Sequence, residues 1–196
     1  MIMKIYRIIQ IILSYIVLCC YKIKYHNNLY IGKGSSIYRK SLIRIDSSSA
    51  YIKIGEQTLI GRSKRGYHSA MPFYTTLFVD TNFAHIEIGN NCRINGAYIH
   101  SQKKIVIGNN CVIAAGVNIF DSNRHVVKSN DRTRGRDIAQ EIIIGNNVWI
   151  GVNAIILKGT VIGDNSVIAA GSVVKGIFPN NSIIMGNPSK LIKQWK

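Results

Sequence analysis

Large aliphatic residues recur at every sixth position towards the C-terminal end of the chain. A strand has a side-chain period of about 2 and a helix one of about 3.6, so neither needs a strict period of six. A parallel β-helix with three flat faces per coil does need it, because each face contributes one short strand and one turn. The aliphatic positions are Ile144, Ile150, Ile156, Ile162, Ile168 and Val174, and each of the first five is followed four residues later by a small or β-branched residue, at Val148, Ala154, Thr160, Ser166 and Ser172.

The same spacing continues upstream with interruptions, and the register slips by one residue before Ile107. The upstream aliphatic positions are Ile54 and Ile60, then Ile88 and Ile94, then Ile107, Ile113 and Ile119. Residues 61–84 and 120–141 lack such positions and carry polar, aromatic and charged side chains. On a solenoid, insertions of this kind project as loops, where functional residues concentrate. The pattern therefore predicts an all-β solenoid from about Ile54 to Val174 with two loops.

The N-terminal segment 5–21 is strongly apolar but is interrupted by Arg7 and Gln10. Its uninterrupted part is shorter than the ~20 apolar residues that span a bilayer. We favour a helix lying in the membrane interface, with basic flanks attracted to anionic lipid. The alternative is a helix packed on the end of the solenoid or in an oligomer contact.

These features divide the chain into two parts. Residues 1–27 form the apolar helix, and residues 28–196 form the solenoid with its C-terminal tail 176–196. We expect that residues 1–24 can be removed without unfolding the solenoid, because the recognisable repeats begin later.

The chain is strongly basic, with 25 Lys and Arg against nine Asp and Glu and a formal net charge of +16. Such a balance suits nucleic acid, an anionic membrane surface or phosphorylated small molecules. No nucleic-acid-binding motif occurs, and aromatic residues do not alternate with basic ones on a strand face. We therefore expect no nucleic-acid partner.

The four cysteines match neither a disulfide framework nor a zinc site. Cys92 and Cys111 fall on small inward positions, so we expect them to be core thiols, whereas Cys19 and Cys20 are adjacent in the apolar segment. No group of His, Cys, Asp or Glu has the spacing of a metal site, so no metal is expected. Nothing requires an oxidising compartment, which favours the cytoplasm.

His125 is the most distinctive candidate for chemistry, because it lies in a polar loop just after a coil. A partly exposed histidine there is free to act as a general base. His100 lies near the register slip and could line the same cleft, although a surface role is the alternative. Asp121 could orient the His125 imidazole, and its alternative is a turn former. No serine lies in a G-x-S-x-G turn, which argues against a nucleophilic hydrolase.

Four short segments carry a resemblance to a known family: VWIG (148–151), ILKG (156–159), AAGSVV (169–174) and MGNPSK (185–190). Residues 86–193 resemble the hexapeptide-repeat O-acetyltransferases, which include maltose, galactoside, capsule and O-antigen acetyltransferases of bacteria. The resemblance implies a left-handed parallel β-helix with a short C-terminal helix, assembled as a homotrimer with acetyl-CoA bound between adjacent solenoids. It implies transfer of an acetyl group to a sugar hydroxyl. The loop SNRHVV and the apolar N-terminus favour a surface polysaccharide as acceptor, modified at the inner membrane.

The resemblance also implies roles for individual residues. His125 is implied as the general base, and Trp149 as a second catalytic residue, although an aromatic filling a subunit seam is the alternative for Trp149. The other implied contacts are Gly151, Ala170, Lys175, Lys190 and Lys193 with acetyl-CoA, and Asn95, His100 and Asp121 with the acceptor. One departure is that the lysine after the AAGSVV segment is displaced by one position, to Lys175.

Two other functions are open from the sequence. The protein could acetylate a small sugar or an antibiotic, or it could be a β-helix scaffold without catalytic activity. An exposed histidine on an insertion loop and a basic tail after the last coil favour the enzyme, because a scaffold needs neither.

Overall fold

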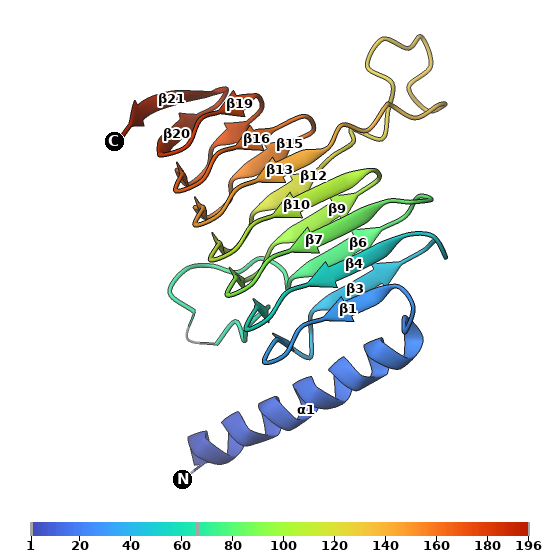
Figure 1. Cartoon of the computed structure of the whole chain (residues 1–196), viewed down its shortest axis with the longest axis vertical. Helices are drawn as coiled ribbons and strands as arrows, with labels where there is room; N and C mark the ends of the chain where they lie inside the picture. Colours follow the sequence, from blue (N-terminus) through green and yellow to red (C-terminus); the bar gives the residue numbers. More distant parts are fainter. Residues whose placement is uncertain (1, 66, 196) are drawn as a thin grey trace.

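The computed structural model describes residues 2–65 and 67–195, and these form one long stack of coils with a helix across its N-terminal end (Figure 1). Each coil contributes short strands to three parallel sheets, which we name faces A, B and C. Face A consists of β1 (Leu29–Ile31), β4 (Tyr51–Ile54), β7 (His85–Ile88), β10 (Lys104–Ile107), β13 (Ile142–Ile144), β16 (Val161–Ile162) and β19 (Ile177–Phe178).

Faces B and C follow face A in each coil. Face B consists of β2 (Ser36–Ile37), β5 (Leu59–Ile60), β8 (Arg93–Ile94), β11 (Val112–Ile113), β14 (Trp149–Ile150), β17 (Val167–Ile168), β20 (Ser182–Gly186) and β21 (Ser189–Gln194). Face C consists of β3 (Leu42–Ile45), β6 (Thr76–Val79), β9 (Tyr98–Ser101), β12 (Asn118–Phe120), β15 (Ile155–Leu157) and β18 (Val173–Val174).

The predicted aliphatic positions form the core of this stack. Ile150, Ile156 and Ile162 are at most 1% exposed, and equivalent positions pair across successive coils, as Ile113 does with Ile150. The small positions are buried between them, including Ser166. The parallel β-helix predicted from the period of six is therefore confirmed, with aliphatic and small residues pointing inward.

Glycine and asparagine form the corner between faces A and B. A Cβ added to Gly89 would lie 2.7 Å from the carbonyl carbon of Gly108 in the next coil, so the coils approach too closely for a side chain. The side-chain oxygen of Asn109 accepts a hydrogen bond from the Asn90 backbone N–H at 2.8 Å, and Asn146 does the same for Asn109 at 2.9 Å. This ladder satisfies the backbone groups that the turns leave unpaired.

The solenoid begins earlier than the sequence pattern indicated. Its first coil starts at Leu29 and buries Ile37 and Ile43, because the spacing continues upstream with serine and tyrosine between the aliphatic positions. The predicted loop 61–84 is too long. Strand β6 lies within it and buries Leu77 completely, so the insertion ends before β6.

The predicted C-terminal helix is wrong. Residues Ser189–Gln194 form β21, which pairs antiparallel with β20. The last coil leaves the edge of β20 open, and the chain reverses at Gly186, whose φ is +109°. Pairing with that edge satisfies backbone groups that a helix would have left unpaired.

A helix, α1 (Ile2–Lys24), closes the other end of the stack (Figure 1). Leu18 joins the core, and the Tyr21 hydroxyl donates to the Ser41 carbonyl and accepts from the Ile43 N–H, both at 3.2 Å. The helix thus covers the first coil and pairs part of its backbone. The expectation that residues 1–24 can be removed without consequence for the solenoid does not agree with this packing. In the described part of the chain, no helix is long and apolar enough to cross a membrane.

Candidate active site

An insertion between β12 and β13, residues 121–141, carries the candidate base and projects from the corner between faces C and A (Figure 1). Its first residue, Asp121, is fully buried. The Asp121 carboxylate accepts hydrogen bonds from the Ser101 hydroxyl at 2.7 Å and from the backbone N–H groups of Gln102, Lys103 and Lys104 at 2.7–2.8 Å. Asp121 therefore anchors the base of the insertion to the preceding coil.

This position contradicts both sequence expectations for Asp121. Its oxygens are occupied by four donors of the chain itself, and none of the contacts described for it involves His125. A carboxylate with no exposed surface cannot contact an acceptor, so we remove Asp121 from the acceptor-binding residues. The interpretation as a residue that forms a turn is closer to its observed role.

Asp137 closes the other end of the insertion. Its carboxylate accepts from the Ser122 hydroxyl at 2.5 Å, from the Asn123 N–H at 2.7 Å and from the Lys158 ammonium at 2.7 Å. Burial raises the pKa of Asp137, but the hydrogen bonds from Lys158, Ser122 and Asn123 outweigh it and bring the pKa to about 2. Both ends of the insertion are thus fixed to the solenoid, with Lys158 paired to Asp137.

The low pKa of Asp137 predicts how stability changes with pH. The folded-state pKa of about 2 lies below the ordinary value of 3.8, so the ionised form stabilises the folded state above about pH 4. That stabilisation is lost as the pH falls from about 4 towards 2. We expect Asp137→Asn to lower the thermal unfolding midpoint at neutral pH and the difference from the unaltered protein to shrink below pH 4. A difference that stays constant from pH 7 to pH 3 would contradict this assignment.

His125 lies between these two fixed ends and is exposed. Its Nδ1 atom is 2.8 Å from the backbone carbonyl oxygen of Arg132. Because a carbonyl oxygen only accepts hydrogen bonds, Nδ1 carries the proton, and Nε2 of the neutral ring presents a lone pair. A turn at Asp131, whose carboxylate accepts from the Thr133 N–H at 2.9 Å, adjoins Arg132 and shapes this part of the insertion. The histidine is held in the tautomer that a general base requires.

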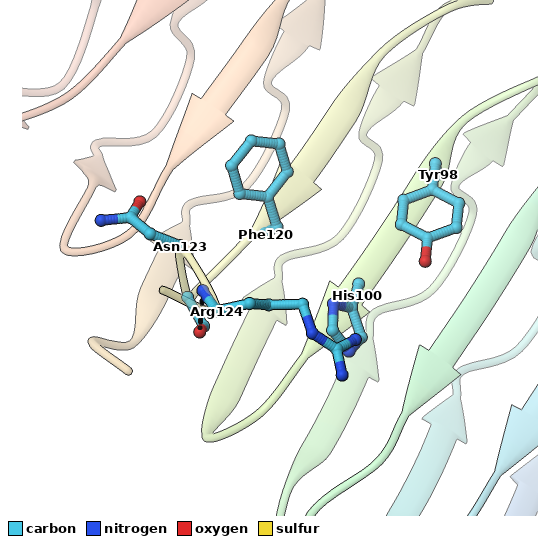
Figure 2. Close-up of a pocket in the computed structure, with 6 residues that line it drawn as sticks. Tyr98, His100, Phe120, Asn123 and Arg124 are labelled. Carbon is cyan, nitrogen blue, oxygen red and sulfur yellow. Dashed lines mark hydrogen bonds between the residues drawn. The ribbon is translucent and has the colours of Figure 1, made fainter. Parts of the chain in front are cut away.

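A cavity of about 250 Å³ opens at the start of the insertion (Figure 2). Its walls come from three elements, with rings from β9 and β12 and polar side chains from the insertion. The lining residues are Tyr98, His100, Phe120, Ser122, Asn123 and Arg124. Figure 2 shows the Arg124 side chain extending from the insertion towards His100. The combination of ring faces with polar groups suits a polar ligand that also has apolar faces.

His100 forms the floor of this cavity and is only 4% exposed. Its ring stacks on Phe78 of the preceding coil, with centroids 4.6 Å apart and planes 15° apart. Its Nε2 lies 3.1 Å from Asp80 Oδ1 without the geometry of a hydrogen bond. The same carboxylate is 3.2 Å from the Arg124 guanidinium and accepts from the Gln102 amide at 3.2 Å. His100 and Arg124 are thus both tied to Asp80.

Most of the other predicted site residues lie on a different side of the same chain. Trp149 projects from β14 on face B and is 55% exposed, and Lys190 and Lys193 lie exposed on β21 of that face. Gly151 and Ala170 adjoin the corner between faces B and C. A Cβ added to Gly151 would lie 2.7 Å from the Ala170 nitrogen. Within one chain, the structure does not bring these residues to His125.

Asn95 and Lys175 also divide between the two sides. Asn95 follows β8 at the corner between faces B and C, where the first insertion packs on Gly96. Lys175 is exposed between β18 and β19, at the corner that carries His125 in an earlier coil. One coil stack therefore presents a base-bearing side, with His125 and His100, and a second side with Trp149, Asn95 and the terminal lysines.

The sequence analysis missed three residues that shape the site. No sequence pattern marks Asp137 or Asp80, because their partners are distant in sequence and reach them only through the stacking of coils. Phe78 was missed because the sequence pattern placed it in a loop, and only the pairing of β6 with β3 shows that it follows the inward position Leu77. Among the described residues, no group of three or more His, Cys, Asp or Glu could hold a metal ion.

Comparisons with known proteins agree with this fold. The family described as Bacterial transferase hexapeptide (six repeats) matches residues 141–176. WbbJ of Escherichia coli K12, which bears the name of a lipopolysaccharide biosynthesis O-acetyl transferase, is 35% identical over 120 residues, or 56% of this chain and 61% of WbbJ. The galactoside O-acetyltransferase of Escherichia coli K12 is 38% identical over 112 residues, or 57% of this chain and 55% of that protein.

Solved structures give the same result. A hexapeptide-repeat acetyltransferase from Vibrio cholerae, solved in complex with acetyl coenzyme A, is 26% identical with a TM-score of 0.58, covering 73% of this chain and 70% of that one. AntD, an N-acyltransferase from Bacillus cereus, has a TM-score of 0.65 over 89% of this chain and 87% of its own, but at 19% identity it supports the fold alone.

These matches confirm the resemblance inferred from the sequence. Residues 141–176 match the hexapeptide-repeat transferases, and the chain is similar to named O-acetyltransferases over 56–57% of its length. It spans about three fifths of the length of the curated relatives it matches.

Proposed function

We propose that the protein is an acetyl-CoA-dependent O-acetyltransferase that acts on a sugar hydroxyl. The observation that carries this proposal is the contact of His125 Nδ1 with the Arg132 carbonyl, which leaves Nε2 free to accept a proton. The relatives support the reaction class, since one bears the name of a galactoside O-acetyltransferase and another was solved with acetyl coenzyme A.

The reaction begins with proton removal from the acceptor. His125 Nε2 takes the hydroxyl proton as the oxygen attacks the thioester carbonyl of acetyl-CoA, and a tetrahedral oxyanion forms. Backbone N–H groups at a solenoid corner are suitable donors to that oxyanion. When the intermediate collapses, the carbon–sulfur bond breaks and the imidazolium returns its proton to the coenzyme A thiolate. The products are the acetyl ester and free coenzyme A, and His125 is again neutral.

The cavity beside the insertion is our proposed acceptor subsite. Tyr98 and Phe120 offer ring faces to the apolar face of a sugar, and Asn123 and Arg124 offer hydrogen-bond donors to its hydroxyls. His100 lines the floor, which keeps it among the acceptor-binding residues.

The division of site residues between two sides of the chain favours a shared site. In one chain the proposed base lies at one corner, whereas Trp149, Gly151, Ala170, Lys190 and Lys193 adjoin face B. A neighbouring chain can place its second side against the base-bearing side of the first. We therefore propose a homotrimer in which acetyl-CoA binds between adjacent solenoids. In this arrangement Lys175 contacts acetyl-CoA and Asn95 contacts the acceptor. The left-handed sense of the coil stays a prediction from the resemblance.

A bacterial surface polysaccharide is the acceptor that we propose, because WbbJ bears the name of a lipopolysaccharide biosynthesis enzyme. The test measures free thiol released from acetyl-CoA by purified protein with free glycans, lipid-linked glycans and chloramphenicol as separate acceptors. We expect glycan-dependent thiol release. Release with chloramphenicol alone would support the antibiotic acetyltransferase, and no release with any acceptor would support the scaffold.

A further inference from the structure

Helix α1 carries apolar side chains on its outer side as well as on the side that packs on the solenoid, where Leu18 joins the core. Polar side chains of the helix face the solenoid, where the Gln10 amide oxygen accepts from Arg39 Nε at 2.7 Å and the Ser14 hydroxyl accepts from the Arg39 backbone N–H at 3.2 Å. In an ordinary amphipathic surface helix, such residues face water and the apolar residues face the core.

The outward side of the helix is apolar. Its side chains are 42–79% exposed, which is unusual for a row of this length made of isoleucine and tyrosine. These residues, which we name the outer face of α1, are Tyr6, Ile8, Ile9, Ile11, Ile12, Tyr15, Ile16 and Ile23. Because α1 lies across the end of the coil stack, nothing in the described chain covers this side (Figure 1).

The charge around this end of the molecule is predominantly positive. Residues 1–45, which include α1 and the first coil, hold eight Lys and Arg and no Asp or Glu. The first acidic residue is Asp46. Lys22 and Lys24 lie in the last turn of α1, and both are exposed. Residues 1–45 therefore contribute half of the net charge of +16, and one of their cations, Arg44, pairs with Asp46.

We propose that the outer face of α1 docks on the surface of an anionic lipid bilayer. An apolar face with basic flanks inserts shallowly among headgroups, where it buries aliphatic side chains and attracts anionic lipid. A second copy of the chain fits less well, because it would bring two predominantly basic ends together. This surface is separate from the proposed acetyl transfer, so either proposal can fail without the other.

The test measures co-sedimentation of the full chain with two kinds of vesicle. One is phosphatidylcholine alone, and the other contains ~30% phosphatidylglycerol as the anionic lipid. We expect binding to the anionic vesicles and weaker binding to the neutral ones or at high salt. The triple variant Ile8→Gln, Ile12→Gln and Ile16→Gln removes one exposed stripe of the outer face without touching the contacts of Gln10 and Ser14. It is expected to weaken vesicle binding by roughly tenfold or more.

A matched control carries the same three changes at other exposed isoleucines, Ile138→Gln, Ile177→Gln and Ile192→Gln, and is expected to bind vesicles normally. Thermal unfolding checks that both triple variants remain folded. Equal vesicle binding by the unaltered protein and the Ile8, Ile12 and Ile16 variant would overturn the proposal. The proposal would also fail if the Ile8, Ile12 and Ile16 variant lost its oligomers in light scattering but still bound vesicles. The outer face would then contact a second copy of the chain. Thiol release with a soluble acceptor reports separately on the proposed acetyl transfer.

Discussion

His125→Ala is expected to lower kcat by ~10²–10⁴-fold while leaving the KM for acetyl-CoA nearly unchanged. The reason is that the Nδ1 contact with the Arg132 carbonyl directs the Nε2 lone pair outward, where it takes the acceptor proton only in the transition state. Loss of the imidazole leaves the acetyl-CoA contacts in place, because His125 is not among the residues proposed for them. Steady-state thiol release at saturating acetyl-CoA measures the effect.

His26→Ala is the matched control, since His26 is exposed at the end of α1 and has no place in the proposed reaction. It should keep the kcat of the unaltered protein with a soluble acceptor. If His125→Ala kept near-normal turnover, the base would be another group, and His100 in the floor of the cavity would be tested next.

The second large effect concerns stability. Asp121→Ala is expected to lower the free energy of unfolding by about 3–5 kcal/mol, because three backbone N–H groups and the Ser101 hydroxyl lose their acceptor in a buried site. Each unsatisfied buried donor costs ~1–3 kcal/mol, and partial rearrangement reduces the sum. Denaturant unfolding gives the value directly.

Two comparisons sharpen the test of Asp121. Asp121→Asn keeps one acceptor oxygen and should be less destabilising than Asp121→Ala. Asp46→Ala removes a carboxylate whose partner is the exposed Arg44, and a surface ion pair of this kind contributes ~0–1 kcal/mol. A loss for Asp121→Ala as small as that for Asp46→Ala would mean that the insertion is not held by its first residue.

The repeats were predictable where the spacing of six is unbroken, because that spacing indicates which side chains point inward. The prediction failed where an insertion separates the strands of one coil. Leu77 is fully buried at the next position on face C after Ile43, but 16 residues lie between it and Ile60 on face B of its own coil. Only the pairing between coils reveals that Leu77 belongs to the core.

The candidate site was predictable in its central residue but not in its supports. His125 was identified from its loop and from the family resemblance, whereas its tautomer depends on a carbonyl seven residues away. The roles of Asp121 and Asp137 were missed, since each is set by donors from other coils. A buried carboxylate and an exposed ligand-binding one have the same sequence signature, and only accessibility distinguishes them.

The position of α1 under the first coil has a geometric consequence for the acceptor. Successive coils rise by ~4.8 Å, and His125 follows β12 of the fourth coil, so the proposed base stands three coil spacings, or roughly 14 Å, above the first coil. With the outer face of α1 on a bilayer, the stack acts as a spacer of fixed height. Under the proposed sugar acetylation, this spacer would select sugar units at a set distance from a lipid anchor, and adding or removing one whole coil would move the acetylated unit along the glycan without altering the site.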